Sequence, residues 1–234
     1  MTSHSSHSSH SSRATLSADY QRNWPAYFDA IATQPPRDTC LRALAALVEC
    51  VRTSDDQPVA FDLGCGEGRD TRAILSSYDR LRVLAIDASP EGLRRLSATL
   101  GPSAPRVQTI ECSLEGLPTL HASNATLPRH ALLVNASFAL PFCHEESFPD
   151  LWTWIRRLLS GSNTRPSGLF AGQLFGDRDE WVATNPRRHV SRSQLDALLL
   201  GWTILHLDEV EKEGSDAMGG TKHHHVFHVV ARAD

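Results

Sequence analysis

The sequence contains no long hydrophobic run. Its 234 residues never approach the roughly 18 consecutive apolar positions that a membrane-spanning helix needs, and the first residues lack the apolar core of a secretion signal. The five cysteines stand singly, without a C-x-x-C pair or the even count of a disulfide framework. We therefore expect a cytoplasmic protein in a reducing compartment, with no membrane partner.

The sequence also lacks an excess of either charge. Its formal net charge is -4, and 41% hydrophobic with 21% charged residues is ordinary for a globular protein. A chain with this balance exerts no long-range attraction on a polyanion, which disfavours nucleic acid as a partner. The length allows one large domain or two small ones.

We expect one domain over residues 15–234, preceded by a short tail. Residues 1–14 are mostly Ser and His and cannot bury enough apolar surface to offset the entropy of ordering, so they are predicted to be disordered. The evenly spaced His4, His7 and His10 have no acidic or cysteine partner, and no metal site is predicted there. Residues 15–52 would form an N-terminal helical segment, and residues 59–234 the core.

Residues 59–70 combine an apolar strand, an acid, a glycine-rich turn and the start of a helix. They read VAFDLGCGEGRD, with Gly64, Gly66 and Gly68 after Asp62. Glycines allow close approach of the backbone to a ligand and a positive φ angle. A dinucleotide fingerprint, G-x-G-x-x-G, would have its third glycine at Arg69. The pattern predicts a ligand-binding strand-turn-helix crossover and disfavours a dinucleotide.

The run DLGCGEGRD resembles the first motif of the S-adenosylmethionine-dependent methyltransferases with the Rossmann-like (class I) fold. Over about residues 20–232 the chain is similar to small-molecule enzymes related to the tellurite-resistance and thiopurine methyltransferases. The resemblance implies S-adenosyl-L-methionine as the cofactor. It also implies that the cofactor is bound by residues of this motif, namely Asp62, Gly64, Cys65, Gly66 and Gly68.

A second acid ends the next apolar run, about twenty residues after the glycine turn. Asp87 is the last residue of the predicted strand 81–87, where a carboxylate can accept hydrogen bonds from both ribose hydroxyls of an adenosine. Asp87 and Ala88 are therefore cofactor-binding candidates. Ser89 is a candidate N-cap for the helix that follows, and both roles can coexist. In the family, the corner after the strand at 107–112 faces the adenine ring, which makes Leu114 a further candidate.

The strand predicted at 131–138 runs into the segment NASFALPFCH. Ligands bind at strand ends where the strand order of an open α/β sheet reverses. We therefore expect Asn135 to contact the cofactor, and Phe138 and Phe142 to contact the substrate. Methyltransferases that act on exocyclic base amines carry an Asp/Asn-Pro-Pro-aromatic run here, and its absence disfavours that substrate class.

An aromatic cluster precedes the core. Its spacing suits either core packing or the family's N-terminal lid, a helix with a W-x-x-Y pattern that Trp24 and Tyr27 match. A lid would exclude water from the transfer, with Trp24 against the substrate. Gln173 and Phe175, in the strand predicted at 169–175, are also candidate substrate-binding residues.

The remaining periodicity predicts the architecture. Amphipathic helices are expected at 38–52, from 69 to about 77, at 91–100, at 148–159 and from Ser191 to Gly201, and an antiparallel hairpin at 202–210 and 225–231. The fold class is therefore α/β: a three-layer α-β-α sandwich around a seven-stranded, mostly parallel sheet with a C-terminal antiparallel hairpin strand.

The histidines at 223, 224, 225 and 228 invite a metal-binding interpretation. Successive side chains of a strand point to opposite faces, so three of these histidines cannot converge on one ion. No metal site is predicted.

Methyl transfer from a sulfonium is an in-line displacement, in which proximity and orientation can lower the barrier by ~7–11 kcal/mol. A general base is needed only if the nucleophile arrives protonated. The candidates are His144, Asp177 and Tyr27. The acceptor would be a small molecule with a chalcogen oxyanion, thiol, hydroxyl or carboxyl group, and the protein a monomer or homodimer. Two alternatives stay open: a domain that binds S-adenosylmethionine without turnover, and a nicotinamide-dependent oxidoreductase.

Overall fold

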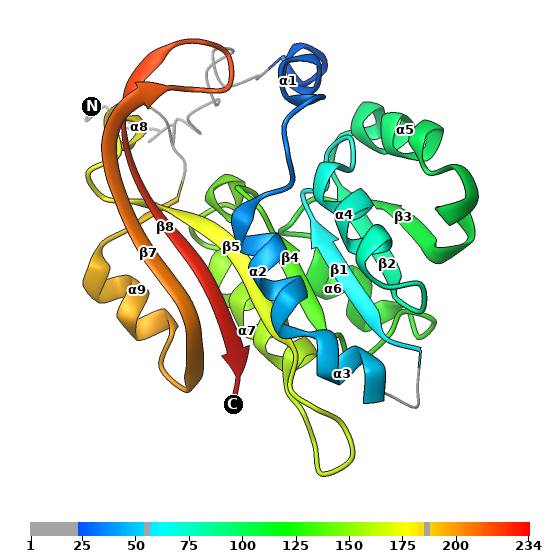
Figure 1. Cartoon of the computed structure of the whole chain (residues 1–234). Coiled ribbons are helices and arrows are strands. Elements are labelled where there is room, and N and C mark those ends of the chain that lie inside the picture. Colours follow the sequence, from blue (N-terminus) through cyan, green and yellow to red (C-terminus); the bar gives the residue numbers. More distant parts are fainter. Residues whose placement is uncertain (1–22, 54–56, 185–187) are drawn as a thin grey trace, which may run out of the picture.

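A mixed β-sheet with helices on both faces organises the chain (Figure 1). The computed structural model describes residues 23–53, 57–184 and 188–234, so the tail predicted at 1–14 lies outside the described residues. The strands are β1 (Val59–Leu63), β2 (Arg82–Asp87), β3 (Val107–Glu111), β4 (Leu133–Ala136), β5 (Leu169–Gly176), β6 (His189–Val190), β7 (Trp202–Ser215) and β8 (Thr221–Ala233).

Eleven helical segments accompany these strands in the described part of the chain. They are α1 (Trp24–Ile31), α2 (Asp38–Ala46), α3 (Val48–Thr53), α4 (Arg69–Ser77), α5 (Pro90–Thr99), η2 (Gly101–Arg106), α6 (Leu117–Ser123), η3 (Leu140–Phe142), α7 (Phe148–Leu159), α8 (Trp181–Thr184) and α9 (Arg192–Leu198).

The strand order is β3-β2-β1-β4-β5-β8-β7, and the two-residue β6 pairs with β5. The pairs among β1 to β5 are parallel, whereas β8 runs antiparallel to both β5 and β7. The predicted α/β class, with its mostly parallel sheet and antiparallel C-terminal hairpin, is confirmed. Because the strand order reverses between β1 and β4, the carboxyl ends of these two strands border the crevice where such sheets bind ligands.

Each face of the sheet buries its own apolar cluster. Leu44, Ile74 and Leu96, from α2, α4 and α5, pack on one face. On the other face Ile155 of α7 and Leu195 of α9 pack against the sheet. The sheet is therefore covered on both sides, and its open edge with the ends of β1, β2, β4 and β5 remains for a ligand.

Several predicted boundaries were wrong. The helix expected at 38–52 is divided into α2 and α3, because the Leu47 N–H bonds to the carbonyls of both Ala43 and Leu44 and tightens the last turn of α2. Helix α6 was not predicted, although Pro118 stands at its first turn. The hairpin strands β7 and β8 extend well beyond 210 and begin before 225, so the charged segment between them belongs mostly to the strands.

Strand β4 ends earlier than predicted because the backbone turns at Phe138. Among the described residues Phe138 is the non-glycine residue with a positive φ, 53°. Its N–H donates to Oε1 of the buried Gln173 at 3.0 Å. The Gln173 amide in turn donates to Oγ1 of Thr39 in α2 at 2.8 Å. Gln173 of β5, itself held by Thr39 of α2, thus fixes the turn.

Two arms rise above the carboxyl edge of the parallel strands: α1 and the tip of the β7–β8 hairpin (Figure 1). Asn23 caps α1 by accepting the Ala26 N–H at 3.1 Å. Asp29 of α1 pairs with Arg95 of α5 at 2.6 Å, and Phe28 is buried beneath the helix. This ion pair and the Phe28 ring hold α1 over the α5 side of the glycine turn.

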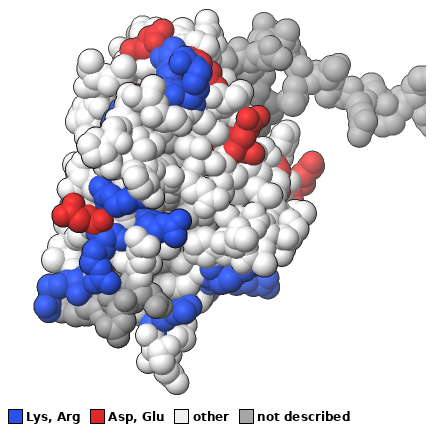
Figure 2. Space-filling view, turned by 90° about the vertical axis from the view of Figure 1, so that its right-hand side faces the viewer, with Lys and Arg blue, Asp and Glu red and all other residues white. Residues whose placement is uncertain are grey.

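Charged side chains of both signs are scattered among neutral residues on the face shown in Figure 2. Among the described residues, none of the helices has the length and apolar character to cross a membrane.

The strain at Phe138 predicts a difference between two variants that both lose the ring. A left-handed conformation costs an L residue about 1–2 kcal/mol, and glycine avoids this cost. Glycine also has a larger conformational entropy in the unfolded state, which cancels part of the resulting gain in stability. Phe138→Gly is therefore expected to unfold with a free energy about 0.5–1 kcal/mol larger than that of Phe138→Ala, measured in urea. A Phe138→Ala protein as stable as Phe138→Gly would contradict the left-handed turn.

Candidate active site

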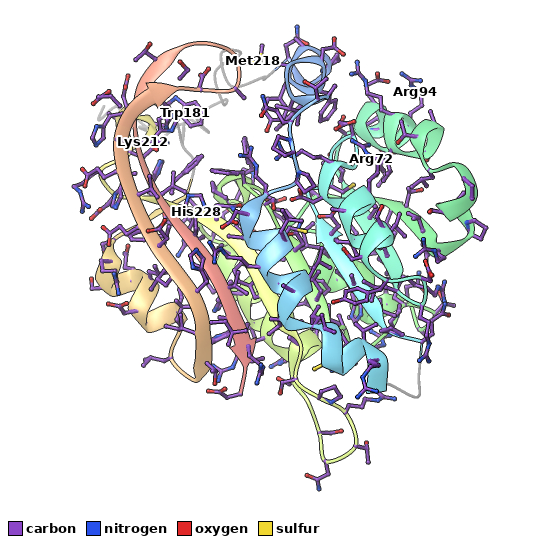
Figure 3. The ribbon with its side chains drawn as sticks, in the orientation of Figure 1. Arg72, Arg94, Trp181, Lys212, Met218 and His228 are labelled. Carbon is purple, nitrogen blue, oxygen red and sulfur yellow. The ribbon has the colours of Figure 1, made fainter. Side chains whose placement is uncertain are left out.

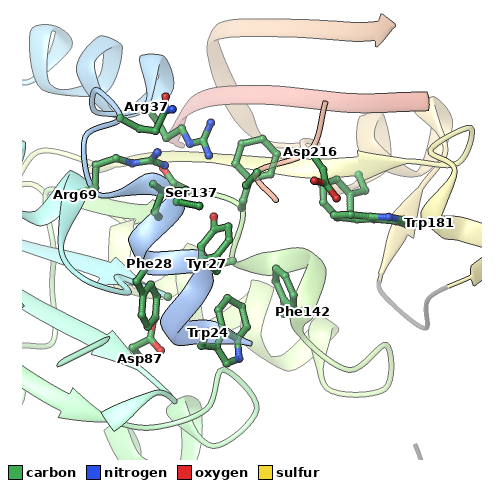
Figure 4. A pocket seen from close by; sticks show the side chains of 18 of the residues that line it. Trp24, Tyr27, Phe28, Arg37, Arg69, Asp87, Ser137, Phe142, Trp181 and Asp216 are labelled. Atoms are coloured by element: carbon green, nitrogen blue, oxygen red, sulfur yellow. The ribbon is translucent and has the colours of Figure 1, made fainter. Parts of the chain in front are cut away.

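A cavity of about 490 Å³ opens at the carboxyl edge of the sheet, between α1 and the β7–β8 hairpin (Figure 4). Small-molecule sites typically occupy about 300–1,000 Å³. Many of the residues proposed from the sequence line it: Trp24, Tyr27, Gly64, Asp87, Ala88, Leu114, Phe138, Phe142 and Phe175.

Asp87 lies at the cavity wall at the end of β2, and its two oxygens are held by backbone groups. Oδ2 accepts the Gly66 N–H and Oδ1 the Ser89 N–H, each at 2.7 Å. Burial raises the pKa of Asp87, while these two N–H groups act in the opposite direction. Each carboxylate oxygen has a further acceptor position, so the fixed side chain can still accept two hydroxyl groups from a ligand.

The glycine turn shapes the wall next to Asp87. Gly64, Gly66 and Gly68 all have positive φ angles, 64°, 55° and 87°. Gly64 lines the cavity, and a Cβ there would meet the Cβ of Ala139 at 2.6 Å. Gly66 and Gly68 are not among the lining residues, and a Cβ on Gly66 would meet the Phe28 ring at 3.0 Å. Their contribution is to the fold of the turn.

Behind the turn lies a buried polar network that includes Asp62 and Asn135. Asp62 accepts hydrogen bonds from the Thr71 hydroxyl at 2.5 Å and from Asn135 Nδ2 at 2.8 Å. Burial, with the nearby Asp70 carboxylate, raises the pKa of Asp62 to about 7, against the effect of the two donors. Asp62, Asn135 and the buried Cys65 lie outside the cavity lining, so any effect they have on a ligand acts through the turn.

Two arginines that were not assigned from the sequence face the middle of the cavity. Arg37 lies between α1 and α2, and its backbone N–H donates to Asp70 Oδ1 at 2.9 Å. Arg69 is the first residue of α4. Figure 4 shows their guanidinium groups near each other and near Tyr27. Burial and the Arg69 charge lower the pKa of Arg37, whereas Tyr27 and Asp70 act the other way. The buried Arg37 Nε makes no hydrogen bond within the described residues.

The far half of the cavity, at the ends of β5, β7 and β8, is aromatic. Trp181 lies 5.6 Å from Phe175 between ring centroids, and Phe138 lies 6.0 Å from Phe175. Figure 3 shows Trp181 beside the hairpin whose tip carries Met218. Lys222 of β8 joins these rings at the wall and pairs with the buried Asp179.

The structure separates the predicted proton acceptors. Tyr27 lines the cavity. His144 is exposed outside the lining, where its N–H donates to Glu115 at 3.0 Å. Asp177 lies 3.6 Å from the ring of His225, also outside it. Gln173 is likewise outside the lining and acts on the site through the backbone of Phe138.

The residues that sequence reasoning missed had little local signal. Arg69 was visible as the departure from a dinucleotide fingerprint, but nothing in its spacing says that its side chain faces Arg37. Lys222 stands in a run of histidines and Trp181 in a charged loop, and only the β5–β8 pairing brings them together. Among the described residues no group of three or more His, Cys, Asp or Glu is placed to hold a metal ion.

Comparisons with known proteins agree with this geometry. Residues 60–161 match the family described as "Methyltransferase domain". A trans-aconitate 2-methyltransferase from Azoarcus sp. (strain BH72) is 29% identical over 126 residues, or 54% of this chain and 42% of the relative. The match thus spans less than half of that relative's length.

Solved structures share the fold. TehB from Haemophilus influenzae has a TM-score of 0.60 at 15% identity, over 81% of this chain and 62% of that one. The 1,6-didemethyltoxoflavin-N1-methyltransferase from Burkholderia thailandensis, with 1,6-didemethyltoxoflavin and S-adenosylhomocysteine bound, has a TM-score of 0.54 at 21% identity, over 90% and 85%. The chain thus resembles the Rossmann-like (class I) S-adenosylmethionine-dependent methyltransferases in its glycine turn and its sheet, and residues 60–161 match a methyltransferase domain.

Proposed function

We propose that this protein transfers the methyl group of S-adenosylmethionine to a small-molecule acceptor. The observation that carries the proposal is the meeting, in one cavity, of a bare glycine turn, a fixed carboxylate at the end of β2 and a pair of arginines. These groups match the three chemically distinct parts of the cofactor.

The ribose and adenine suit the end of the cavity at β2 and β3. The Asp87 oxygens have acceptor capacity for a vicinal diol, and Ala88, Cys112 and Leu114 supply an apolar wall beside them. The carboxylate is fixed before a ligand arrives, so little ordering entropy is lost on binding.

The amino-acid end suits Arg37 and Arg69. The Asp70 carboxylate lies 3.8 Å from Arg69 Nε, whereas the buried Arg37 Nε makes no hydrogen bond within the described residues, so this pair of guanidinium groups suits a further anion. A carboxylate can accept two parallel N–H hydrogen bonds from one guanidinium group. Gly64 lines the same cavity and leaves the backbone bare there, which suits the chain that connects the two ends of the cofactor.

When bound, S-adenosylmethionine supplies a methyl group on a positively charged sulfur that leaves as a neutral thioether. The residues of this chain bind the cofactor and the acceptor and orient them toward each other. Helix α1, held to α5 by the Asp29–Arg95 pair, covers the cavity from one side and limits access of water. An acceptor that arrives protonated must release its proton as the new bond forms. Of the predicted bases we assign this role to Tyr27, whose side chain lines the cavity.

We propose a cytoplasmic setting because the five cysteines are all unpaired. A domain that binds the cofactor without turnover remains the alternative; a nicotinamide enzyme is disfavoured because Arg69 fills the place of the third glycine.

Asp87 gives the most direct test. Asp87→Asn keeps the shape but replaces one acceptor oxygen with an NH2 donor, which can accept neither a ribose hydroxyl nor a backbone N–H, so S-adenosylmethionine should bind roughly tenfold more weakly or worse by calorimetry. Asp79→Ala, an exposed acid beyond α4, is the control and should bind as the wild type does. The proposal fails if the wild type binds NAD and not S-adenosylmethionine, or if Asp87→Asn binds S-adenosylmethionine unchanged.

Arg37 tests the orientation of the cofactor. Arg37→Met should weaken binding of S-adenosylhomocysteine by roughly tenfold, because one charge-assisted contact is lost. Binding of 5′-methylthioadenosine, which has no amino-acid carboxylate, should change little. Equal losses of affinity for both ligands would show that Arg37 does not act on the carboxylate of the cofactor.

Turnover separates an enzyme from a binding domain. Incubation with S-adenosylmethionine and a panel of carboxylic acids (trans-aconitate included), phenols, thiols and chalcogen oxyanions should release S-adenosylhomocysteine, followed by mass spectrometry. Because Tyr27 also interacts with Arg37, Tyr27→Phe should lower the rate by a larger factor than it lowers cofactor affinity. Tight cofactor binding without product from any acceptor class would favour the binding domain.

A further inference from the structure

The half of the cavity farthest from Asp87 contains a cation that the cofactor does not need. Lys222 is 4% exposed and lines the cavity at the start of β8, beside Phe175 and Trp181. The proposed cofactor contacts lie at the ends of β1, β2 and β3 and at the arginines. Since β5 and β8 lie beyond β4 in the sheet order, Lys222 belongs to the space left for the acceptor.

Asp179, the counter-ion of Lys222, also accepts hydrogen bonds from two backbone N–H groups. Asp179 is buried, and its Oδ1 accepts the Trp181 N–H at 3.1 Å while Oδ2 accepts the His225 N–H at 3.2 Å. Two backbone donors thus stabilise this carboxylate in addition to Lys222. The pair fixes the position of the ammonium at the cavity wall, where the charged group of an anionic ligand would meet it.

The aromatic rings around Lys222 do not form a cage for a cationic acceptor. The Lys222 Nζ already lies 3.8 Å from the centroid of the Trp181 ring and 5.2 Å from that of Phe175. These negative ring faces are therefore occupied by the protein's own cation. A second cation placed among them would meet the charge of Lys222 in a poorly solvated space.

Asp216 is a carboxylate that faces this half of the cavity, and it accepts hydrogen bonds from the turn of the β7–β8 hairpin. Its Oδ1 accepts the Met218 N–H at 2.8 Å and the Gly220 N–H at 2.9 Å. Donation from the turn offsets its charge and holds it in place. Figure 4 shows it next to Trp181. The second oxygen, Oδ2, is the position at which a cationic acceptor would bind, so the test below includes a cation.

We propose that the methyl acceptor is an anion with an apolar, ring-sized body, whose charged group contacts Lys222 while its body packs among Phe138, Phe142, Phe175 and Trp181. This inference rests on the proposed function, because it places the acceptor opposite the cofactor. A carboxylate is the simplest group of this kind.

The test compares ligands that differ only in charge. Protein saturated with S-adenosylhomocysteine is titrated by calorimetry with benzoate and benzamide, with trans-cinnamate and cinnamamide, and with benzylamine as a cation. At least one carboxylate should bind tenfold or more tightly than its amide, the size expected of a charge-assisted contact. Benzylamine should bind most weakly of the compounds of its size.

Variants assign the preference to Lys222. Lys222→Met should remove the preference for the carboxylate, and Lys222→Arg should retain it. Because Lys222→Met leaves a buried carboxylate unpaired, the double variant Lys222→Met with Asp179→Asn is measured beside it. Lys212→Met, an exposed lysine of β7 (Figure 3), is the matched control and should behave as the wild type.

The outcomes separate this inference from the proposed function. Failure of the wild type to bind S-adenosylhomocysteine overturns the proposed function. Binding of S-adenosylhomocysteine with no tested carboxylate preferred over its amide, or with benzylamine preferred, overturns the anionic acceptor alone. A carboxylate preference that survives in Lys222→Met and in the double variant overturns the role of Lys222.

Discussion

The ligand-binding edge depends on a buried hydrogen-bond network beneath the glycine turn. Asp62 of β1 accepts from Thr71 of α4 and from Asn135 of β4, and Asn135 also donates to Asp70 at 3.3 Å. Asp70 in turn holds the backbone of Arg37. One set of contacts therefore connects two strands, the first helix after the turn and the segment that follows α1. Buried polar groups of this kind specify an arrangement because each is costly without its partner.

The same network explains how much the sequence could predict. The turn, the acid at Asp87 and the alternation of strands and helices are local patterns, and they predicted the fold class and one half of the cavity. They could not show that Asp62 and Asn135 face each other behind the turn, since strand pairing decides this. Nor could local patterns place Lys222 against Trp181. That contact depends on the register between β5 and β8, which no short-range signal encodes.

The cavity has two chemically different halves because the sheet has two different parts. Beside β1 and β2, parallel strands end in backbone turns that present N–H groups and carboxylates. Beyond β4, the antiparallel hairpin presents side chains from the start of β8 and the end of β7. Phe138, turned by its left-handed backbone, stands between them beneath Arg37, 4.5 Å from the ring centroid. Changes in the hairpin can therefore alter one half with little effect on the other.

Strand β7 also has a consequence for how copies of this chain meet. As the last strand in the sheet order, it leaves a row of peptide groups that a foreign strand could extend. A bulge between Ile204 and His206 interrupts that row, and Glu209, Glu211 and Lys212 add charge along it. Such features discourage edge-to-edge aggregation. The long hairpin that carries Lys222 to the cavity thus lies at the rim of the molecule with its outer edge protected against pairing with a foreign strand.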